Sequence, residues 1–294
     1  MYLIDATAFC YRAFYALKGL STSFGQPTNA IYGFINMLNK ILKEKKPEYI
    51  AACFDVSRDT FRARKFAEYK VNRPPMPEGL SSQLPLIKQV IRAQGLAFFE
   101  KQGFEADDLI ATIARKAKEE GFFTLIVSSD KDILQLVDEE TTVLSPSSDA
   151  EVSYTAQEVL NRFGVAPERI TDYLALTGDD ADNIPGIRGI GEKTATHLLK
   201  EFGSLDQLLE GVLRIKQEKI RQILSDNLDK IRLNKELVKL DEGVELDFDL
   251  ESLRLKEPDK KELFRLFKYL EFKKFVKEFA AEEEGGKNIQ VSEL

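Results

Sequence analysis

Short apolar runs alternate with amphipathic stretches over residues 1–145 of the chain. The stretch Ile31–Leu42 carries its apolar residues at helical spacing, which is typical of a helix with one buried face. Four runs have the length and continuous apolar character of buried strands, namely Tyr2–Ile4, Tyr49–Phe54, Leu96–Phe99 and Phe123–Val127. Strands that alternate with helices predict an α/β fold, with a mostly parallel central sheet flanked by helices.

Strand-like runs nearly disappear after residue 155, and five stretches with helical periodicity follow: Thr155–Phe163, Thr171–Thr177, Lys193–Phe202, Lys216–Leu240 and Lys260–Phe279. Residues 244–255 form a less regular connection. We therefore expect an α/β core over residues 1–160, with a basic insertion over about residues 56–95. An all-helical region over residues 161–280 follows, and the acidic, glycine-containing residues 281–294 are expected to form a linker or tail.

The composition narrows the chemistry that the chain can perform. Its 294 residues include 42 Lys and Arg, 49 Asp and Glu, and one histidine, for a net charge of −7. With His197 alone, a Ser-His-Asp triad or a pair of histidines is nearly excluded. The acidic balance does not exclude nucleic acid, because binding to phosphates depends on local patches. Two cysteines in apolar segments, and the lack of a secretory leader or a membrane-length apolar run, favour a cytoplasmic protein.

Acidic side chains follow the predicted strands where each strand ends. Asp5 comes directly after Tyr2–Ile4, and Asp55 directly after Tyr49–Phe54. Because the carboxyl ends of parallel strands meet at one edge of a sheet, these carboxylates should lie close together. The acidic residues expected at this edge are Asp5, Asp55, Glu105, Asp107, Asp108, Asp130, Asp132, Asp179 and Asp182.

Each of these carboxylates alone also fits ordinary turn or helix-capping chemistry, but the set does not. Two like charges about 4 Å apart repel by about 4 kcal/mol at an effective dielectric of about 20, so the group requires cations. Oxygen ligands without His or Cys suit Mg²⁺ or Mn²⁺ better than zinc. More acids than one octahedral ion can use indicate two ions, the arrangement used for in-line hydrolysis of phosphodiesters.

A glycine-containing hairpin over residues 184–195 precedes a predicted helix. Gly186, Gly189 and Gly191 come before Lys193 and Thr194, which lie in the first turn of that helix. A helix rather than a strand precedes the segment, so it is neither a dinucleotide fingerprint nor a P-loop. Its backbone N–H groups are placed to hold a phosphate without contacting bases, although a plain helix–helix turn is the alternative.

The insertion carries a basic segment, Arg58–Arg73, interrupted by Phe61, Phe66 and Tyr69. Aromatic rings beside Lys and Arg side chains are typical of surfaces that bind single-stranded nucleic acid. A solvated helical face is the alternative interpretation. Because the segment follows Asp55, we expect it to lie over the acidic edge of the sheet.

In their order along the chain, these motifs resemble the 5′-nuclease domain of bacterial DNA polymerase I and its flap endonuclease relatives, over about residues 1–280. The matching segments are Leu3–Asp5, Tyr11–Ala13, Phe54–Asp55, Phe61–Arg62, Tyr69–Lys70, Arg73–Pro77, Gly103–Asp108, Asp130–Asp132, Leu176–Asp179 and Asp182–Ala195. The resemblance implies a PIN-like core, a helical arch insertion and a helix-hairpin-helix-type motif. It also implies an enzyme that cuts DNA at 5′ ends and flaps, leaving 5′-phosphate and 3′-hydroxyl products, in primer removal and repair.

The same resemblance assigns roles to individual residues. One Mg²⁺ would lie among Asp5, Asp55, Glu105, Asp107 and Asp108, and a second among Asp130, Asp132, Asp179 and Asp182, with Mn²⁺ able to substitute. Catalysis would depend on Asp5, Asp55 and Asp130, with Lys70 and Arg73 stabilising charge on the phosphate. The expected DNA contacts are Arg12, Arg62, Tyr69, Lys70, Arg73, Gly186, Gly189, Gly191, Lys193 and Thr194, with K⁺ at the hairpin.

The implied partners are DNA with 5′ flaps or 5′ ends and RNA primers on DNA, bound by a monomer associated with the bacterial nucleoid. Two other functions fit parts of the sequence. A haloacid-dehalogenase-type phosphatase would need a second aspartate where the chain has Thr7. A DNA-junction binder without hydrolytic activity would not need the carboxylates. The sequence leaves open the preference for exonuclease or flap cleavage, and whether the chain is a separate protein or part of a polymerase.

Overall fold

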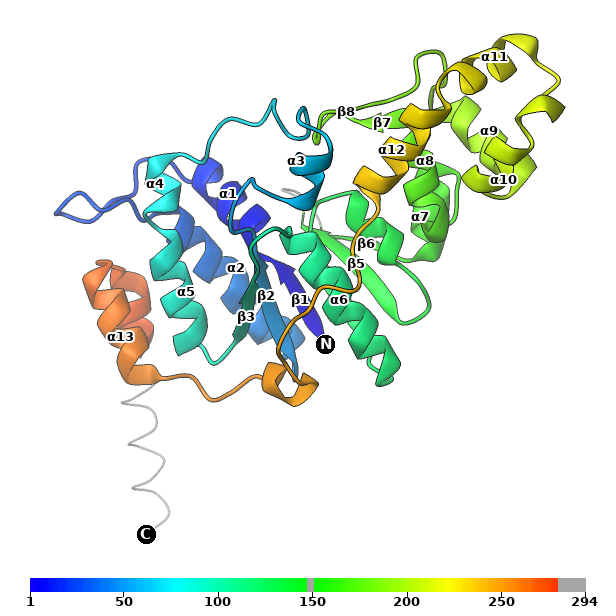
Figure 1. The fold of residues 1–294 in the computed structure, drawn as a ribbon. Coiled ribbons are helices and arrows are strands. Elements are labelled where there is room, and N and C mark those ends of the chain that lie inside the picture. The colour runs from blue at the N-terminus through cyan, green and yellow to red at the C-terminus, as the bar shows by residue number, and fades with distance from the viewer. Residues whose placement is uncertain (147–150, 280–294) are drawn as a thin grey trace. The chain divides into compact units, whose positions relative to one another are not determined.

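The computed structural model describes residues 1–146 and 151–279, and its centre is a six-stranded sheet (Figure 1). The strands are β1 (Tyr2–Asp5), β2 (Ile50–Phe54), β3 (Ala97–Glu100), β4 (Thr124–Val127), β5 (Thr141–Pro146) and β6 (Glu151–Tyr154), in the order β3-β2-β1-β4-β5-β6. β4 pairs in parallel with both β1 and β5, whereas β6 is antiparallel to β5. This mostly parallel sheet with flanking helices confirms the predicted α/β class.

The sequence predicted β1 to β4 but not β5 and β6. β5 is interrupted by threonine, serine and proline, so it has no continuous apolar run. β6 has only one buried residue, Tyr154, because it forms the edge of the sheet. Edge strands need not be apolar on both faces, which is why periodicity missed them.

Packing divides the chain into two compact units, each made of separate segments. The first comprises residues 1–5, 53–75 and 100–247, and the second comprises residues 6–52, 76–99 and the chain from residue 248. The predicted boundary at residue 160 divides the chain by sequence order and stays a prediction. The predicted tail over residues 281–294 lies outside the described residues.

The first unit contains eight α-helices and a small strand pair among its described residues. They are α3 (Phe61–Lys65), α6 (Ala106–Glu119), α7 (Ala156–Phe163), α8 (Ile170–Thr177), α9 (Glu192–Phe202), α10 (Leu205–Glu210), α11 (Glu218–Asp226) and α12 (Leu228–Val238), with a two-strand pair β7 (Gly178–Asp179) and β8 (Ile184–Pro185). α6 packs on β1 and β4 through a face that includes Ala111, Ala114 and Ala117. These small side chains allow the helix to lie close to the sheet.

One predicted helix, Lys216–Leu240, is two helices in the structure. α11 ends at Asp226 and α12 begins at Leu228, because Asn227 leaves the helical conformation and its side chain donates to Ile223 O at 2.8 Å. The predicted helix Lys260–Phe279 is also interrupted. α13 ends at Tyr269, Glu271 adopts a positive φ, and residues 273–279 are helical again. Asparagine favours such local side-chain bonds over continued helix.

The second unit is built around a close helix pair. Its helices are α1 (Ala6–Ala16), α2 (Asn29–Lys45), α4 (Glu78–Ser81), α5 (Leu84–Ala93) and α13 (Lys260–Tyr269). A Cβ on Gly33 of α2 would lie 2.6 Å from the Ala13 Cβ of α1, so only glycine permits this approach. Asn29 donates to Phe14 O and Leu17 O, and accepts from Gln83 at 2.9 Å, which satisfies polar groups in the interior. Across the described residues, no helix has both the length and the apolar character to cross a membrane.

The first unit also depends on a buried amide. Asn234 of α12 donates to Ala175 O of α8 and to Pro185 O of β8, each at 3.0 Å. An Asn234→Ala substitution leaves both carbonyls without this partner, so it should lower the free energy of unfolding by about 1–3 kcal/mol. Urea unfolding followed by circular dichroism measures the loss. Asn161→Ala on the exposed face of α7 is the control and should change stability by less than about 0.5 kcal/mol; equal effects of the two variants would contradict this role of Asn234.

Candidate active site

The sheet topology brings the ends of β1 and β4 side by side. Ile4 is in register with Val127, so the residues that follow them are neighbours, and Ser128 Oγ donates to Asp5 Oδ2 at 2.9 Å. Asp55, which follows β2, accepts from the backbone N–H of Ala106 at 2.8 Å. The strand ends therefore place Asp5 beside the β4 loop and Asp55 beside the start of α6.

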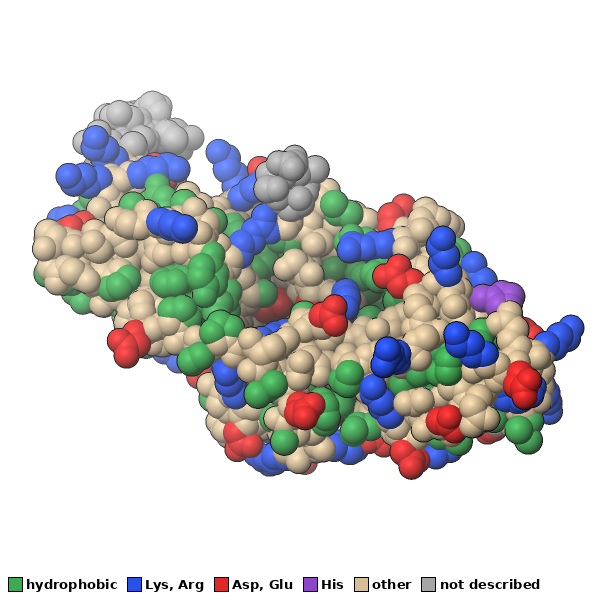
Figure 2. All heavy atoms as spheres, turned by 90° about the horizontal axis from the view of Figure 1, so that it is seen from above, with side chains coloured by type: hydrophobic (Ala, Val, Ile, Leu, Met, Phe, Trp, Pro, Cys, Tyr) green, Lys and Arg blue, Asp and Glu red, His purple; other side chains and the backbone are tan. Residues whose placement is uncertain are grey.

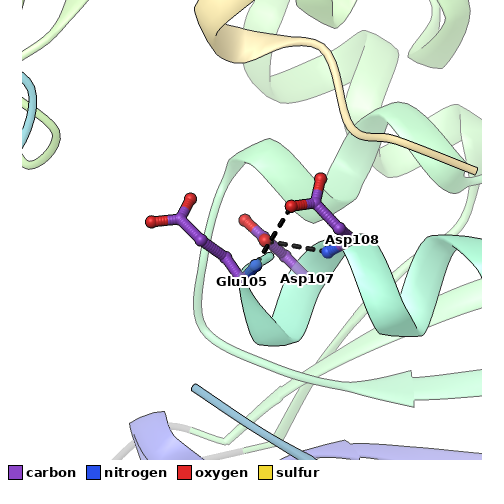
Figure 3. A group of neighbouring side chains, drawn as sticks. All are labelled: Glu105, Asp107 and Asp108. Carbon is purple, nitrogen blue, oxygen red and sulfur yellow. Dashed lines mark hydrogen bonds between the residues drawn. The ribbon is translucent and has the colours of Figure 1, made fainter. Parts of the chain in front are cut away.

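A first acidic cluster lies at the N-terminus of α6 (Figure 3). Glu105, Asp107 and Asp108 have carboxylate oxygens within 4.8 Å of one another. The Asp107 side chain accepts from the Asp108 N–H, and the Asp108 side chain accepts from the Glu105 N–H, as the dashed lines in Figure 3 show. The Glu105 and Asp108 carboxylates both accept from Arg62 Nη1.

A second acidic cluster is formed by Asp132, Asp179 and Asp182, all buried, with carboxylate oxygens within 4.8 Å of one another. Asp132 begins a short 3₁₀ helix after β4. Asp179 ends β7, and Asp182 lies in the turn between β7 and β8. Lys131 Nζ lies 3.0 Å from Asp179 Oδ1. Among the described residues, Asp132 Oδ1 is one of two buried side-chain oxygens without a hydrogen-bond partner.

Tyr69 and Lys70 lie between the two clusters. The Tyr69 hydroxyl is 2.8 Å from Glu105 Oε2 and 2.9 Å from Asp182 Oδ2. The Lys70 ammonium is 2.8 Å from Glu105 Oε1 and 3.3 Å from Asp182 Oδ2. Glu105 of the first cluster and Asp182 of the second therefore face each other across one shared space.

The segment that carries these side chains is bonded to the β7–β8 turn along its length. Lys70, at φ +53°, donates its backbone N–H to Asp182 O at 2.9 Å. Arg73 donates to Ala181 O and pairs with Asp182 Oδ1. A positive φ is rare for a residue other than glycine and is commonly found at functional sites. The basic groups expected near the acidic edge are therefore in direct contact with it.

Crowding of the carboxylates changes their acidity. Burial, together with Asp108 and Glu105, raises the pKa of Asp107 well above its ordinary value. Burial and the charges of Asp130 and Asp182 do the same to the pKa of Asp132. For Lys70, burial opposes the charged form, but Glu105 and Asp182 outweigh it and raise the pKa. The site thus carries an excess of negative charge, which the nearby lysine and arginine side chains neutralise only in part.

The donor set fits hard divalent cations. Every candidate ligand is a carboxylate, and the buried Asp132 Oδ1 has no hydrogen-bond partner. Mg²⁺ and Mn²⁺ prefer oxygen ligands of this kind. Asp130 lies close enough to Asp182 for burial and that charge to raise its pKa, so it belongs to the same region.

One expected DNA contact is corrected by the structure. The Arg62 side chain is 1% exposed and makes a bidentate pair with Asp108 at 2.7 Å for each bond. It has no surface with which to contact a phosphate. The sequence showed a basic, aromatic segment, but not which of its arginines turns inward.

The hairpin over residues 184–195 contains glycines with different structural roles. A Cβ on Gly186 would overlap Thr177 O, so packing requires this glycine, and Gly189 has φ +95°. Gly191 is the N-cap of α9 and has no neighbour within 4 Å of a Cβ position. Lys193 is exposed and Thr194 half-buried in the first turn of α9. In Figure 2, around the purple histidine, Lys and Arg side chains are interspersed with Asp and Glu.

Arg12 and Lys131 lie in different units of the chain. Arg12 is half-buried on α1, in the second unit, and its expected DNA contact stays a prediction. Lys131 was not assigned a role from the sequence, although its position between Asp130 and Asp132 could have indicated one. It pairs with Asp179 and so supplies one of the internal cations.

Two family models match the chain in succession. The 5′-3′ exonuclease N-terminal resolvase-like domain matches residues 1–164, and the 5′-3′ exonuclease C-terminal SAM fold matches residues 165–261. These matches agree with the resemblance that the sequence motifs indicated.

Individual relatives cover the chain to similar extents. It is 42% identical over 278 residues to a 5′-3′ exonuclease of Aquifex aeolicus, which covers 95% of this chain and 94% of that protein. It is 42% identical over 275 residues to DNA polymerase I of Mycobacterium tuberculosis, covering 92% of this chain but only 30% of the polymerase. A bacteriophage T5 flap endonuclease, solved as a pseudo-enzyme–product complex with DNA and metal ions, superposes with a TM-score of 0.68 at 21% identity, over 82% of this chain and 89% of that one. This last likeness shows a shared fold.

The raised pKa values of Asp107, Asp130 and Asp132 predict how divalent ions and pH act together on stability. A carboxyl whose pKa is raised in the folded protein contributes fully to the free energy of unfolding below its ordinary pKa of about 4. That contribution is lost as the pH rises through the raised pKa of the folded state. The metal-free protein should therefore lose stability as the pH rises above the ordinary carboxyl pKa of about 4. A saturating divalent cation should raise the melting temperature more at about pH 8 than at about pH 5.

Thermal unfolding in EDTA and in Mg²⁺ at the two pH values measures this difference. Asp132→Asn, which removes one of the buried charges, should flatten the pH dependence in EDTA. Equal Mg²⁺-induced shifts at both pH values would show that these carboxyls do not titrate in this range.

Proposed function

Because the chain belongs to the 5′-3′ exonuclease family, we propose that it hydrolyses DNA phosphodiester bonds at 5′ ends and at single-strand/duplex junctions. In this proposal it acts as a structure-specific 5′-3′ exonuclease and flap endonuclease, leaving 5′-phosphate and 3′-hydroxyl ends. Its substrates would be 5′ flaps and ends, including RNA primers on DNA. Primer removal in replication and repair of DNA would be its roles, as a monomer associated with the nucleoid.

One observation carries the proposal: two buried carboxylate clusters face each other through Glu105 and Asp182, with Tyr69 and Lys70 between them. All candidate ligands are oxygen atoms, and the cluster lacks sufficient positive charge. Such a site suits two divalent ions, for which we propose Mg²⁺ with Mn²⁺ as a substitute. The T5 relative, whose structure contains DNA and metal ions, supports the assignment to this fold.

When bound, two such ions supply an activated water and stabilise negative charge on the attacking and leaving oxygens. We assign the first ion to Asp5, Asp55, Glu105 and Asp107, and the second to Asp130, Asp132, Asp179 and Asp182, with sharing between them. We assign neither Asp108 to an ion nor Arg62 to DNA, because the two side chains are fully bonded to each other and to their neighbours.

Lys70 and Arg73 are proposed to stabilise charge on the phosphate. Both already project into the acidic site, where they pair with Glu105 and Asp182. Once those carboxylates are neutralised, the same ammonium and guanidinium groups are available to a phosphate a few ångströms away. Tyr69 lies beside them as the proposed stacking residue, which requires its ring to leave its buried position. This chemistry needs no covalent intermediate.

The hairpin and α9 are proposed to hold the duplex. The N-terminus of α9, with Gly191 as its cap and Lys193 exposed in its first turn, presents N–H groups and a positive charge to solvent. Backbone contacts of this kind position a duplex without recognising its sequence. We extend the proposal to K⁺ at this hairpin and to the other expected contacts at Arg12, Gly186, Gly189 and Thr194.

Cleavage of a 5′-labelled flap duplex tests the proposed reaction. We expect cutting near the junction in Mg²⁺ and none in EDTA. Asp5→Asn should lower the cleavage rate by more than about 100-fold. Loss of a residue that only supports a metal ligand typically costs about 10- to 100-fold. Its control, Asp229→Asn, alters a fully exposed aspartate on α12 and should cut at the wild-type rate.

Binding of the flap without cutting in Mg²⁺ and in Mn²⁺ would instead indicate a junction-binding protein. Hydrolysis of a small phosphate monoester with no action on the flap would favour a phosphatase.

Lys193→Ala tests the duplex contact separately from the chemistry. Removing one phosphate contact should weaken DNA binding and reduce the slope of log Kd against log salt concentration by about 0.9. Fluorescence anisotropy in Ca²⁺ or EDTA at several salt concentrations measures that slope. Lys200→Ala, about two turns after Lys193 on the same helix, is the control. An identical slope in wild type and Lys193→Ala would remove Lys193 from the interface.

A further inference from the structure

The Asp108 carboxylate has no lone pair left for an ion. Its Oδ1 accepts from Arg62 Nη2 at 2.7 Å and from the Asp241 N–H at 2.9 Å. Its Oδ2 accepts from Arg62 Nη1 at 2.7 Å and from the Glu105 N–H at 3.1 Å. A carboxylate offers about four lone-pair directions, and here all four are used. The side chain is 0% exposed.

The Arg62 guanidinium is saturated in the same way. Two of its N–H groups bond Asp108, and a third lies 3.2 Å from Glu105 Oε2. The remaining two donate to Leu237 O at 2.8 Å and Lys239 O at 2.9 Å. All five donors of the arginine are thus occupied. Burial opposes its charge, but the bonds to Asp108 and the charge of Asp107 raise its pKa on balance, so the ion pair persists.

These bonds connect the first turn of α6 to the chain that follows α12. Arg62 reaches the carbonyls of residues 237 and 239, and Asp108 reaches the N–H of residue 241. Figure 3 shows the Asp108 carboxylate directed toward that segment. The arginine also contacts Glu105, so the same group that holds the turn in place orients a proposed ligand.

We infer that Arg62 and Asp108 are a positioning pair, which fixes Glu105 and Asp107 for metal binding without Asp108 coordinating an ion or Arg62 contacting DNA. The inference rests on the proposed function only in taking Glu105 and Asp107 as ligands. Coordination by Asp108 would require breaking a buried bidentate pair and leaving the arginine charge uncompensated, which is strongly unfavourable. Proximity of the carboxylates alone does not distinguish a ligand from its support; the hydrogen bonds do.

Calorimetric titration of Mn²⁺ into the DNA-free protein tests Asp108 without relying on cleavage. Asp107→Asn should reduce the number of tightly bound ions. Asp108→Asn should keep that number and weaken the affinity by about 10- to 100-fold, as loss of a group outside the ligand shell does. Loss of an ion in Asp108→Asn equal to that in Asp107→Asn would overturn the inference.

Arg62→Lys separates positioning from DNA contact, because lysine keeps the charge but cannot form the bidentate pair. We expect weaker Mn²⁺ binding and an unchanged salt slope of DNA binding. A slope reduced by about 0.9, with Mn²⁺ affinity intact, would place Arg62 on a phosphate and overturn the inference. Arg64→Lys, two residues away and exposed, is the matched control and should leave Mn²⁺ affinity unchanged.

A double variant covers the case in which a single variant fails to fold. Arg62→Met with Asp108→Leu removes both charges together, which preserves folding better than removing one. If the two residues act as one unit, the double variant should weaken Mn²⁺ binding no more than the more affected single variant. Additive losses would show that they act independently and would contradict the pair.

Hydrogen exchange in EDTA tests the same pair without any metal. The Glu105 and Asp241 amides, which donate to Asp108, should be protected in the wild type and should lose protection together in the Asp108 and Arg62 variants. Unchanged protection in both variants would overturn the inference. If the wild-type protein shows this protection but neither binds Mn²⁺ nor cuts a flap, the proposed function is contradicted. The pairing of Arg62 with Asp108 would not be contradicted by that result.

Discussion

Repulsion among buried carboxylates is the constraint on which the rest of the first unit depends. Six acidic side chains form two clusters of three, and within each cluster the carboxylate oxygens lie within 4.8 Å of one another. Asp5, Asp55 and Asp130 follow the ends of neighbouring strands. At such separations each like-charged pair costs several kcal/mol at moderate dielectric. The fold offsets this cost with cations held in place: Arg62 at the first cluster, Lys131 and Arg73 at the second, and Lys70 between them.

This arrangement explains why segments far apart in the sequence are bonded so closely. Asn72 and Arg73 donate to the carbonyls of Asp180 and Ala181, and Asn183 donates to Glu68 O. The basic segment is therefore joined to the β7–β8 turn through its backbone as well as through its charges. In the proposed function, an ion or a phosphate bound here would compete with these same contacts, which would couple ligand binding to the conformation of residues 66–73.

The carboxylates do not all have the same role. Asp132 has a buried oxygen without a partner, whereas both oxygens of Asp108 are fully bonded. Asp132 is therefore a candidate metal ligand, whereas Asp108 is proposed to position other ligands. Both are aspartates near other acidic residues in the sequence. Likewise, Arg62 and Arg73 belong to one basic segment, yet only Arg73 has substantial exposed surface. Position in a motif identifies the region of the site, and hydrogen bonding identifies the task of each residue.

The local pattern of the sequence determined the β1 to β4 strands, the acidic residues at their ends and the family resemblance, because these depend on short apolar runs and on residue types in a fixed order. It also determined the oxygen-only donor set, since the chain has one histidine and two cysteines. Only the tertiary structure decided that Arg62 turns inward and that β5 and β6 complete the sheet. Those outcomes depend on partners distant along the chain, such as Asp108, Leu237 and Lys239 around Arg62, whose distances no local pattern encodes.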